Sequence, residues 1–290
     1  MTRILAFSGK KQSGKSTSSN FIHGYQLRAF GVIENFAITD KGELLIKSKD
    51  EDSYGLFNAR REDNEFAEWA AYNMWPYIKS YSLAAPLKTI AVELFDIKPE
   101  NVYGTDKQKN EKIEHLLWEN MPGVMTPHEW SMRQGGVAAG YTQHPEQFNI
   151  QLREGPMTAR EFLQFLGTDV MRKMYDNIWC GALIKTITYQ SPLIAVVDDV
   201  RFENEVKAIQ DAGGKVIRLT RSENSDNHSS ETGLDNYKNF DGVIENKDLE
   251  IQETNKQIIS LLDKWGWLGE EIKKEPTKPE IVGGIHKIKE

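Results

Sequence analysis

Short apolar runs alternate along this chain with segments whose apolar residues recur at helical spacing. Five runs have the length and the aliphatic content of buried strands. These runs are Ile4–Phe7, Ser80–Leu83, Leu193–Val197, Val216–Leu219 and Gly242–Ile244. Because helical segments separate them, the pattern predicts an α/β fold, with a doubly wound five-stranded parallel sheet that is flanked by helices.

The helical segments carry ordinary start and stop signals. They are expected at Thr17 to about Ala29, from Pro86 onward, at Glu203–Ala212 and at Leu249 to about Trp265. Pro86 suits a first helical turn, where the missing N–H costs nothing. Gly213 and Gly214 end the third of these segments.

Two insertions interrupt the alternation. We expect one domain over residues 1–268, with insertions at about 31–78 and 98–156, followed by a C-terminal extension over residues 269–290. In the first insertion, the turn Asp40-Lys41-Gly42 predicts a β-hairpin in which Gly42 takes the left-handed conformation. A charged segment and then a helix around Phe66 and Trp69 follow it. The second insertion is polar and has few clear periods.

Composition restricts the class of protein. The 290 residues are 39% hydrophobic, which is enough for a sizeable core, and no apolar stretch is long enough to span a bilayer. The formal net charge of −7 argues against a general nucleic-acid binder. The one cysteine, Cys180, excludes an internal disulfide and fits a reducing compartment. We therefore expect a cytoplasmic protein with neither a membrane nor a nucleic acid as partner; a homodimer stays open.

The first predicted strand runs directly into a glycine-rich loop. Residues Gly9 to Ser16 match the phosphate-loop pattern G-x-x-x-x-G-K-[ST] at every fixed position. The glycines allow backbone N–H groups to point at one anion, Lys15 would reach the β- and γ-phosphates, and the Ser16 hydroxyl could ligate Mg²⁺. An accidental Gly-rich turn is the alternative, but a strand precedes the loop and a helix follows it. The nucleotide-binding residues predicted here are Gly9, Lys10, Ser13, Gly14, Lys15, Ser16 and Thr17.

A second polar pattern lies on the segment Ala159–Arg172, which has a helical period. Its polar residues at steps of four are Arg160, Gln164, Thr168 and Arg172. Residues so spaced line one face of a helix, and two arginines with an amide and a hydroxyl suit a phosphate and a base edge. A solvated helix face is the alternative.

The third predicted strand, Leu193–Val197, ends in Asp198-Asp199-Val200-Arg201. Ligands of open α/β sheets bind at the carboxyl ends of strands, so these side chains are candidates for the same site. Asp198 and Ser16 are the predicted Mg²⁺ ligands. Arg201 and Glu205 lie four residues apart, and a structural ion pair between them is the alternative to a functional role.

Taken together, these stretches resemble the phage deoxynucleoside monophosphate kinases. The shared segments are Ser8–Lys15, Leu83–Lys88, Leu163–Asp169, Trp179, Asp199–Arg201 with Glu205, and His228–Leu234. They cover roughly two thirds of the chain in the same order. The resemblance implies a P-loop nucleoside monophosphate kinase fold with helical NMP-binding and lid segments. It also implies transfer of the ATP γ-phosphoryl group, with Mg²⁺, to a deoxynucleoside 5′-monophosphate.

The resemblance also implies roles for individual residues. The expected monophosphate site comprises Lys88, Lys107, Arg160, Gln164, Gly167, Thr168, Trp179, Asp199, Arg201 and Glu205. Trp179 suits stacking on a base, and a buried core tryptophan is an equal alternative. Lys15, Arg172 and Arg201 would neutralise the transferring group. Arg221, His228 and Glu231 belong to a lid-like stretch. Ser16 stands where many members carry Asp, and the hairpin insertion and the C-terminal tail have no counterpart in the compact T-even form.

Other phosphate-loop proteins are the competing interpretations. A dephospho-coenzyme A or nucleoside kinase would share the architecture. A GTP-dependent switch needs N-K-x-D, and Asn246-Lys247-Asp248-Leu249 has leucine in place of the aspartate. A nucleic-acid motor is disfavoured by the acidic charge.

Overall fold

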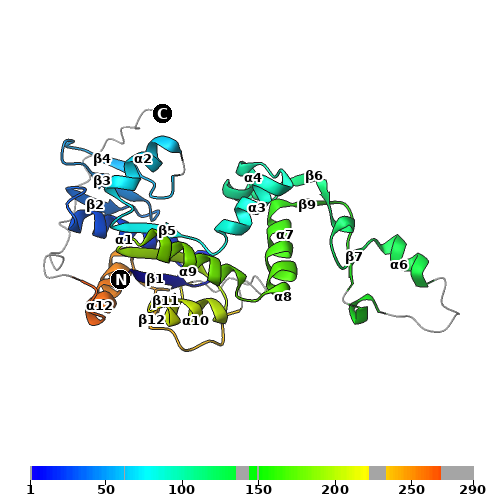
Figure 1. The fold of residues 1–290 in the computed structure, drawn as a ribbon. Helices are drawn as coiled ribbons and strands as arrows, with labels where there is room; N and C mark the ends of the chain where they lie inside the picture. The colour runs from blue at the N-terminus through cyan, green and yellow to red at the C-terminus, as the bar shows by residue number, and fades with distance from the viewer. Residues whose placement is uncertain (1, 62, 135–143, 149, 222–232, 269–290) are drawn as a thin grey trace. The chain divides into compact units, whose positions relative to one another are not determined.

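The computed structural model describes residues 2–61, 63–134, 144–148, 150–221 and 233–268 (Figure 1). The chain divides into two compact units. The sheet unit comprises Met1–Leu83 and Trp179–Glu290, and the second unit comprises Ala84–Ile178. Within the described residues, none of the helices combines the length and the apolar character that crossing a bilayer requires.

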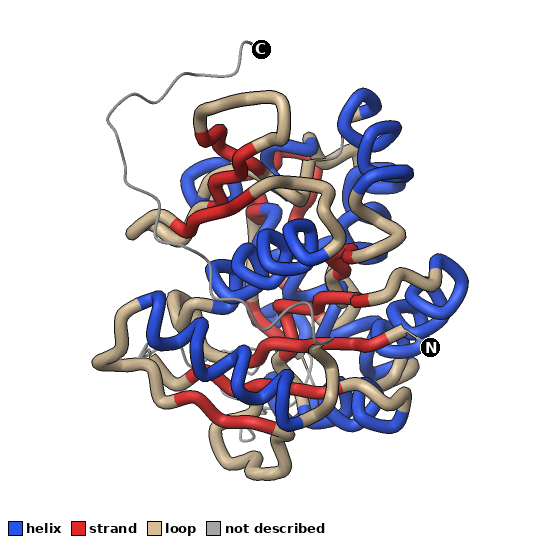
Figure 2. The backbone as a smooth tube through the Cα atoms, turned by 90° about the vertical axis from the view of Figure 1, so that its left-hand side faces the viewer, coloured by secondary structure: helices blue, strands red, loops and turns tan. Residues whose placement is uncertain are grey.

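A five-stranded parallel sheet forms the centre of the sheet unit. Its strands are β1 (Arg3–Ser8), β5 (Ile78–Tyr81), β10 (Ile194–Val200), β11 (Lys215–Leu219) and β12 (Gly242–Ile244), in the order β12-β11-β1-β10-β5. All four neighbouring pairs are parallel. The five predicted strands and their α/β arrangement are therefore confirmed, with helices on either side of the strands (Figure 2).

In the described part of the unit, helices flank this sheet on both sides. They include α1 (Lys15–Ala29), α9 (Ile178–Gln190), α10 (Glu203–Asp211) and α12 (Ile251–Lys264). α1 and α12 bury Phe21, Ile22 and Ile258 in one apolar cluster with Leu5 and Phe7 of β1. This cluster fixes the start of α1 at the end of β1, where the phosphate loop lies.

The first insertion forms a small antiparallel sheet and a helix. β2 (Asn35–Ile38), β3 (Leu44–Lys47) and β4 (Tyr54–Phe57) pair in sequence order, and α2 (Asn64–Asn73) follows. Gly42 has φ +80°, so the predicted hairpin and its left-handed glycine are confirmed. The hairpin packs on α1 at Gly24, where a Cβ would lie 2.4 Å from the Phe36 ring. β4 was not predicted, because charged residues surround its four residues.

The second unit has its own apolar cluster. Its elements are α3 (Ala85–Phe95), α4 (Pro99–Tyr103), α5 (Asp106–Lys109), β6 (Lys112–Leu117), η1 (Trp118–Asn120), β7 (Val124–Met125), α6 (Pro127–Gln134), η2 (Pro145–Phe148), β8 (Gln151–Leu152), β9 (Pro156–Thr158), α7 (Ala159–Gln164), η3 (Phe165–Met171) and α8 (Arg172–Met174). The last three are continuous, so the predicted helix over Ala159–Arg172 is confirmed, with a π-helical middle. Leu163, Leu166 and Val170 pack against the cluster.

Candidate phosphate site

The phosphate loop connects β1 to α1 and has the backbone that its glycines predict. Gly9 has φ +155° and Gly14 has φ +96°. A Cβ on Gly9 would lie 2.3 Å from Ser13 Oγ and 2.7 Å from the Leu219 carbonyl oxygen. Lys15 Nζ donates to the carbonyl oxygens of Gly9 (2.5 Å) and Lys10 (2.8 Å). The loop therefore bends tightly around the lysine ammonium.

The N-terminus of α1 is built to receive an anion. The N-cap residue is Gly14, which has no side chain to cap the helix, and the first turn contains no acidic residue. The exposed N–H groups and the positive end of the helix dipole thus point at the loop. Asn246, which follows β12, steadies the loop through a 3.0 Å hydrogen bond from its Nδ2 to the Ser13 carbonyl oxygen.

An open pocket of about 240 Å³ lies against this loop. Its lining comprises Gln12, Ser13, Gly14, Lys15, Ser16, Thr17, Asp40, Lys41, Gly42, Arg221 and Ile251. The hairpin turn is fixed here, because Asn20 Nδ2 donates to the Gly42 carbonyl oxygen at 2.9 Å and a Cβ on Gly42 would lie 2.1 Å from Thr17 Oγ1. The contribution of Asp40 and Lys41 could not be predicted from the sequence, since nothing local links the hairpin to the loop.

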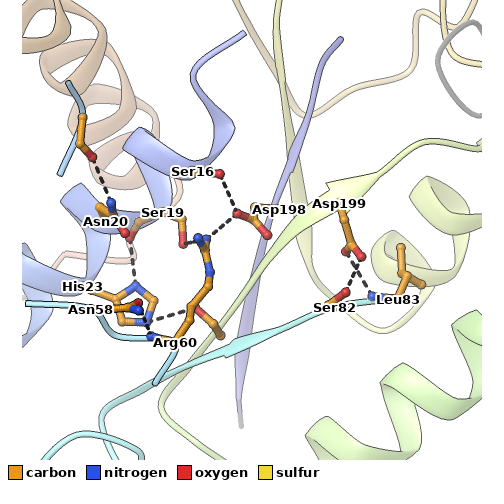
Figure 3. Close-up of polar contacts among 12 residues, drawn as sticks. Ser16, Ser19, Asn20, His23, Asn58, Arg60, Ser82, Leu83, Asp198 and Asp199 are labelled. Atoms are coloured by element: carbon orange, nitrogen blue, oxygen red, sulfur yellow. Dashed lines mark hydrogen bonds and ion pairs between the residues drawn. The ribbon is translucent and has the colours of Figure 1, made fainter. Parts of the chain in front are cut away.

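A β-bulge separates the two aspartates of β10. Ala6 of β1 pairs with Val197 and Ser8 pairs with Val200, so Asp198 and Asp199 together lie opposite the single residue Phe7. A bulge of this kind re-aims the side chains of the longer strand. Asp198 points toward α1, and Asp199 points toward the end of β5 (Figure 3).

Asp198 lies beside the phosphate loop. Its Oδ2 is 3.5 Å from Ser16 Oγ and also accepts a hydrogen bond from Arg60. Burial raises the pKa of the Asp198 carboxyl above its ordinary value, while the Arg60 and Lys15 cations oppose that shift. The predicted Ser16–Asp198 pair is therefore brought together.

These two oxygen donors fit a magnesium ion. Mg²⁺ prefers oxygen ligands, keeps several waters and takes the rest of its shell from substrate phosphates. Among the residues that the structure describes, no cluster of three or more His, Cys, Asp or Glu side chains forms a metal cage. A hydroxyl and one carboxylate next to a phosphate loop are consistent with a metal that arrives with a nucleotide.

Asp199 and Glu205 make structural hydrogen bonds. Asp199 accepts from Ser82 Oγ at 2.5 Å and from the Leu83 N–H at 3.0 Å. Glu205 is buried and accepts from the N–H groups of Arg201 (2.7 Å) and Phe202 (3.0 Å), which fixes the first turn of α10. These bonds hold Arg201 at the carboxyl end of β10. Contact of the three residues with a monophosphate stays a prediction.

Trp179 is 5% exposed and lies in the first turn of α9. Its position agrees with the alternative of a buried core tryptophan, and stacking of Trp179 on a base stays a prediction. Arg221 lines the pocket. His228, Glu231 and the C-terminal extension over residues 269–290 lie outside the described residues.

In the second unit, several predicted residues occupy neighbouring elements. Lys88 Nζ lies 4.9 Å from the centre of the Tyr103 ring, and Arg160 Nη2 lies 2.7 Å from Asp106 Oδ1. Asp106 precedes Lys107 in α5. Gly167 packs so closely on Leu87, next to Lys88, that a Cβ would lie 2.5 Å from Leu87 Cδ2.

The polar residues at steps of four on the helix over Ala159–Arg172 form a helical stripe. Besides Arg160 it comprises Gln164, Thr168 and Arg172, and all three are half-buried. The π-helical turns lie between Arg160 and Arg172. Because a π-helix has more residues per turn than an α-helix, steps of four do not keep one straight line through this stretch. The binding roles of these residues stay predictions.

Behind the phosphate loop, His23 of α1 is buried as a neutral ring. Its Nδ1 is 2.9 Å from the Ser19 carbonyl oxygen, which can only accept, so Nδ1 carries the proton and Nε2 accepts from Ser80 Oγ at 3.2 Å. Burial, together with the Arg60 charge, lowers the pKa of His23 to about 4, although the Ser19 bond opposes this.

The His23 environment predicts a loss of stability in mild acid. The unfolded imidazole takes up a proton below about pH 6.5, whereas the folded one does so only near pH 4. The free energy of unfolding should therefore fall by about 2 kcal/mol between pH 7 and pH 5 from this group. Urea unfolding at both pH values measures it. His23→Gln should flatten the fall, whereas the exposed-site control His115→Gln should keep the wild-type slope; an equal slope in all three proteins would refute the assignment.

Comparison with known proteins shows the family of the chain. The family model for deoxynucleotide monophosphate kinases matches residues 120–258, which include β10 and the helical stripe. A protein of Acanthamoeba polyphaga mimivirus, whose name gives the same activity, is 30% identical over 196 residues, covering 63% of this chain and 81% of the relative. The phosphate loop lies outside the residues that the family model matches. The chain belongs to the deoxynucleotide monophosphate kinase family and is a phosphotransferase that phosphorylates deoxynucleoside monophosphates.

Proposed function

We propose that the phosphoryl donor is ATP with Mg²⁺, bound at the phosphate loop, and that the side chains named below contact the deoxynucleoside monophosphate acceptor. The observation that carries this proposal is the Ser16–Asp198 pair beside the loop at the start of α1. The loop and the start of α1 would bind the phosphates, and the adjacent Ser16–Asp198 pair would ligate the metal.

On the donor side, backbone N–H groups of the loop and the Lys15 ammonium would bind the β- and γ-phosphates. Ser16 and Asp198 would hold Mg²⁺, which neutralises phosphate charge when it is bound. The hairpin turn at Asp40 and Lys41 would border the same nucleotide, because it lines the same pocket.

On the acceptor side, the Arg201 guanidinium would grip the monophosphate through two parallel hydrogen bonds. The further acceptor contacts that we propose are Lys88, Lys107, Arg160, Gln164, Gly167, Thr168, Trp179, Asp199 and Glu205. Lys15, Arg172 and Arg201 would neutralise the transferring group. No general base is required, since the attacking phosphate oxygen is already an anion and catalysis is mainly positioning and charge stabilisation.

A coupled ADP-release assay tests this proposal. ATP is offered with dAMP, dGMP, dCMP, dTMP or the matching ribonucleotides, and in parallel with deoxynucleosides and dephospho-coenzyme A. We expect release of ADP that depends on at least one deoxynucleoside monophosphate and on Mg²⁺. Activity only with a nucleoside or with dephospho-coenzyme A would contradict the proposal.

The acceptor role of Arg160 gives a separate kinetic prediction. Arg160→Ala should raise KM for the monophosphate about tenfold or more, with a smaller change in kcat, since it would remove a charge-assisted contact to the bound acceptor. Initial rates across monophosphate concentrations measure this. The matched control is Arg153→Ala, because Arg153 is an exposed arginine of the same unit, lying over the Trp118 ring. Unchanged KM in Arg160→Ala would contradict an acceptor role for Arg160.

A further inference from the structure

The first insertion delivers an arginine to the carboxylate that we assign to the metal. Arg60 lies in the loop between β4 and α2, and its own N–H donates to Asn58 Oδ1 at 3.0 Å. The preceding residue, Ala59, is buried in the core cluster that α1 shares with the sheet. The loop is therefore anchored directly before the point where the Arg60 side chain leaves it.

The Arg60 guanidinium contacts two residues beside the phosphate loop. Its Nη2 donates to Ser19 Oγ at 3.1 Å and to Asp198 Oδ2 (Figure 3). That same Oδ2 is the atom 3.5 Å from Ser16 Oγ. One carboxylate oxygen thus faces both a fixed cation and the hydroxyl that is expected to ligate Mg²⁺.

The adjacent arginine has a different partner. Arg61 directs Nε and Nη2 to the two carboxylate oxygens of Asp63, at 2.7 and 2.9 Å. Its charge is therefore satisfied at the N-cap of α2, away from Asp198. The pair Arg60 and Arg61 offers a matched comparison within one loop.

Cations near Asp198 act strongly on its carboxylate, because this side chain is largely shielded from water. The Asp198 side chain is 17% exposed, so its charge is only partly solvated. Lys15 and Arg60 are the cations that act on it, and Asp199 opposes them. His23, which faces the same Ser19, is neutral near pH 7 and adds no charge there.

We propose that Arg60 is a positioning residue of the metal site, which holds Asp198 toward Ser16 and is exchanged for Mg²⁺ when the metal binds. This inference rests on the proposed role of Asp198 as a metal ligand. A guanidinium has no lone pair with which to ligate a metal, and it repels a divalent cation that shares its carboxylate oxygen. Arg60 would therefore compete with Mg²⁺ for Oδ2.

Manganese binding tests the exchange without measuring activity. Mn²⁺ is titrated into the full chain loaded with an equimolar non-hydrolysable ATP analogue, and free Mn²⁺ is followed by electron paramagnetic resonance. Arg60→Ala and Arg60→Gln should bind Mn²⁺ roughly two- to fivefold more tightly. This is the range expected when a partly exposed ion pair no longer competes with the metal for the carboxylate. Arg60→Lys and Arg61→Ala should stay within about twofold of wild type.

Asp198→Asn separates this inference from the proposed function. It should weaken Mn²⁺ binding about tenfold or more. If it does so while both neutral variants of Arg60 bind Mn²⁺ as wild type does, or more weakly, the exchange is overturned and the metal assignment stands. If Asp198→Asn binds Mn²⁺ as wild type does, the metal assignment itself is wrong, and the exchange is overturned with it. Circular dichroism and analogue binding confirm that each variant is folded.

Discussion

Lys15→Ala is expected to lower kcat by a factor of about a hundred to a thousand while the fold stays intact. The Lys15 ammonium lies within the phosphate loop, bonded to the carbonyl oxygens of Gly9 and Lys10, and we propose that it contacts the β- and γ-phosphates. Preorganised groups that stabilise developing charge contribute about 3–4 kcal/mol to such a reaction.

The control for this prediction is Lys11→Ala, because Lys11 is an exposed lysine at a variable position of the same motif. Its kcat should stay within about threefold of wild type, which is less than 1 kcal/mol. Retention of more than about a tenth of wild-type kcat in Lys15→Ala would refute the assigned role, since a tenfold loss is only about 1.4 kcal/mol. The circular dichroism spectra and melting temperatures of both variants establish that the fold is intact.

The second large effect is expected for Arg201→Lys, which should lower kcat/KM for the monophosphate at least about tenfold. Lysine keeps the charge but loses the planar fork that binds two phosphate oxygens at once. The turn should survive, because Glu205 binds the backbone N–H of Arg201 rather than depending on its side chain for that contact.

Binding of a fluorescent ATP analogue should change little in Arg201→Lys, since we place Arg201 on the acceptor side. Arg61→Lys, a substitution of the same chemistry at an arginine paired with Asp63, should leave all kinetic constants near wild type. Lost affinity for the ATP analogue together with normal monophosphate saturation would move Arg201 to the donor side.

The central sheet could be predicted from sequence because each of its strands is a short apolar run. Buried parallel strands are apolar on both faces, so β1 and β11 stand out without any knowledge of their partners. The phosphate loop could be predicted for a similar reason: its function needs fixed residue types at fixed local spacing. The placement of Asp198 near Ser16 followed from the rule that parallel strands end at one edge of the sheet.

The features that were missed depend on contacts between distant segments. β4 is short and lies between charged residues, and its pairing with β3 decides its conformation. The bulge at Asp198 and Asp199 is a matter of register with β1, which no local pattern records. Arg60 is one charge among several in its loop, and only the packing of the inserted sheet on α1 brings it to Asp198.

The buried apolar cluster of the second unit could not be predicted for the same reason. The residues Ile113, Trp118, Val124 and Met157 are scattered over a polar stretch, yet they form part of one buried cluster with the helix that carries Arg160. No single window of the sequence contains enough of them to show a period. The roles of Lys107 and Arg172 rest on the resemblance to the family.

The most direct test of the account follows the phosphoryl group itself. The protein is incubated with Mg²⁺, ATP labelled in the γ-phosphate and a deoxynucleoside monophosphate, and the products are separated. We predict that the label appears in the deoxynucleoside diphosphate in amounts equal to the ADP formed, and that Lys15→Ala forms both products about a hundred- to a thousandfold more slowly. Label recovered as inorganic phosphate, with the monophosphate unchanged in every case, would contradict the account.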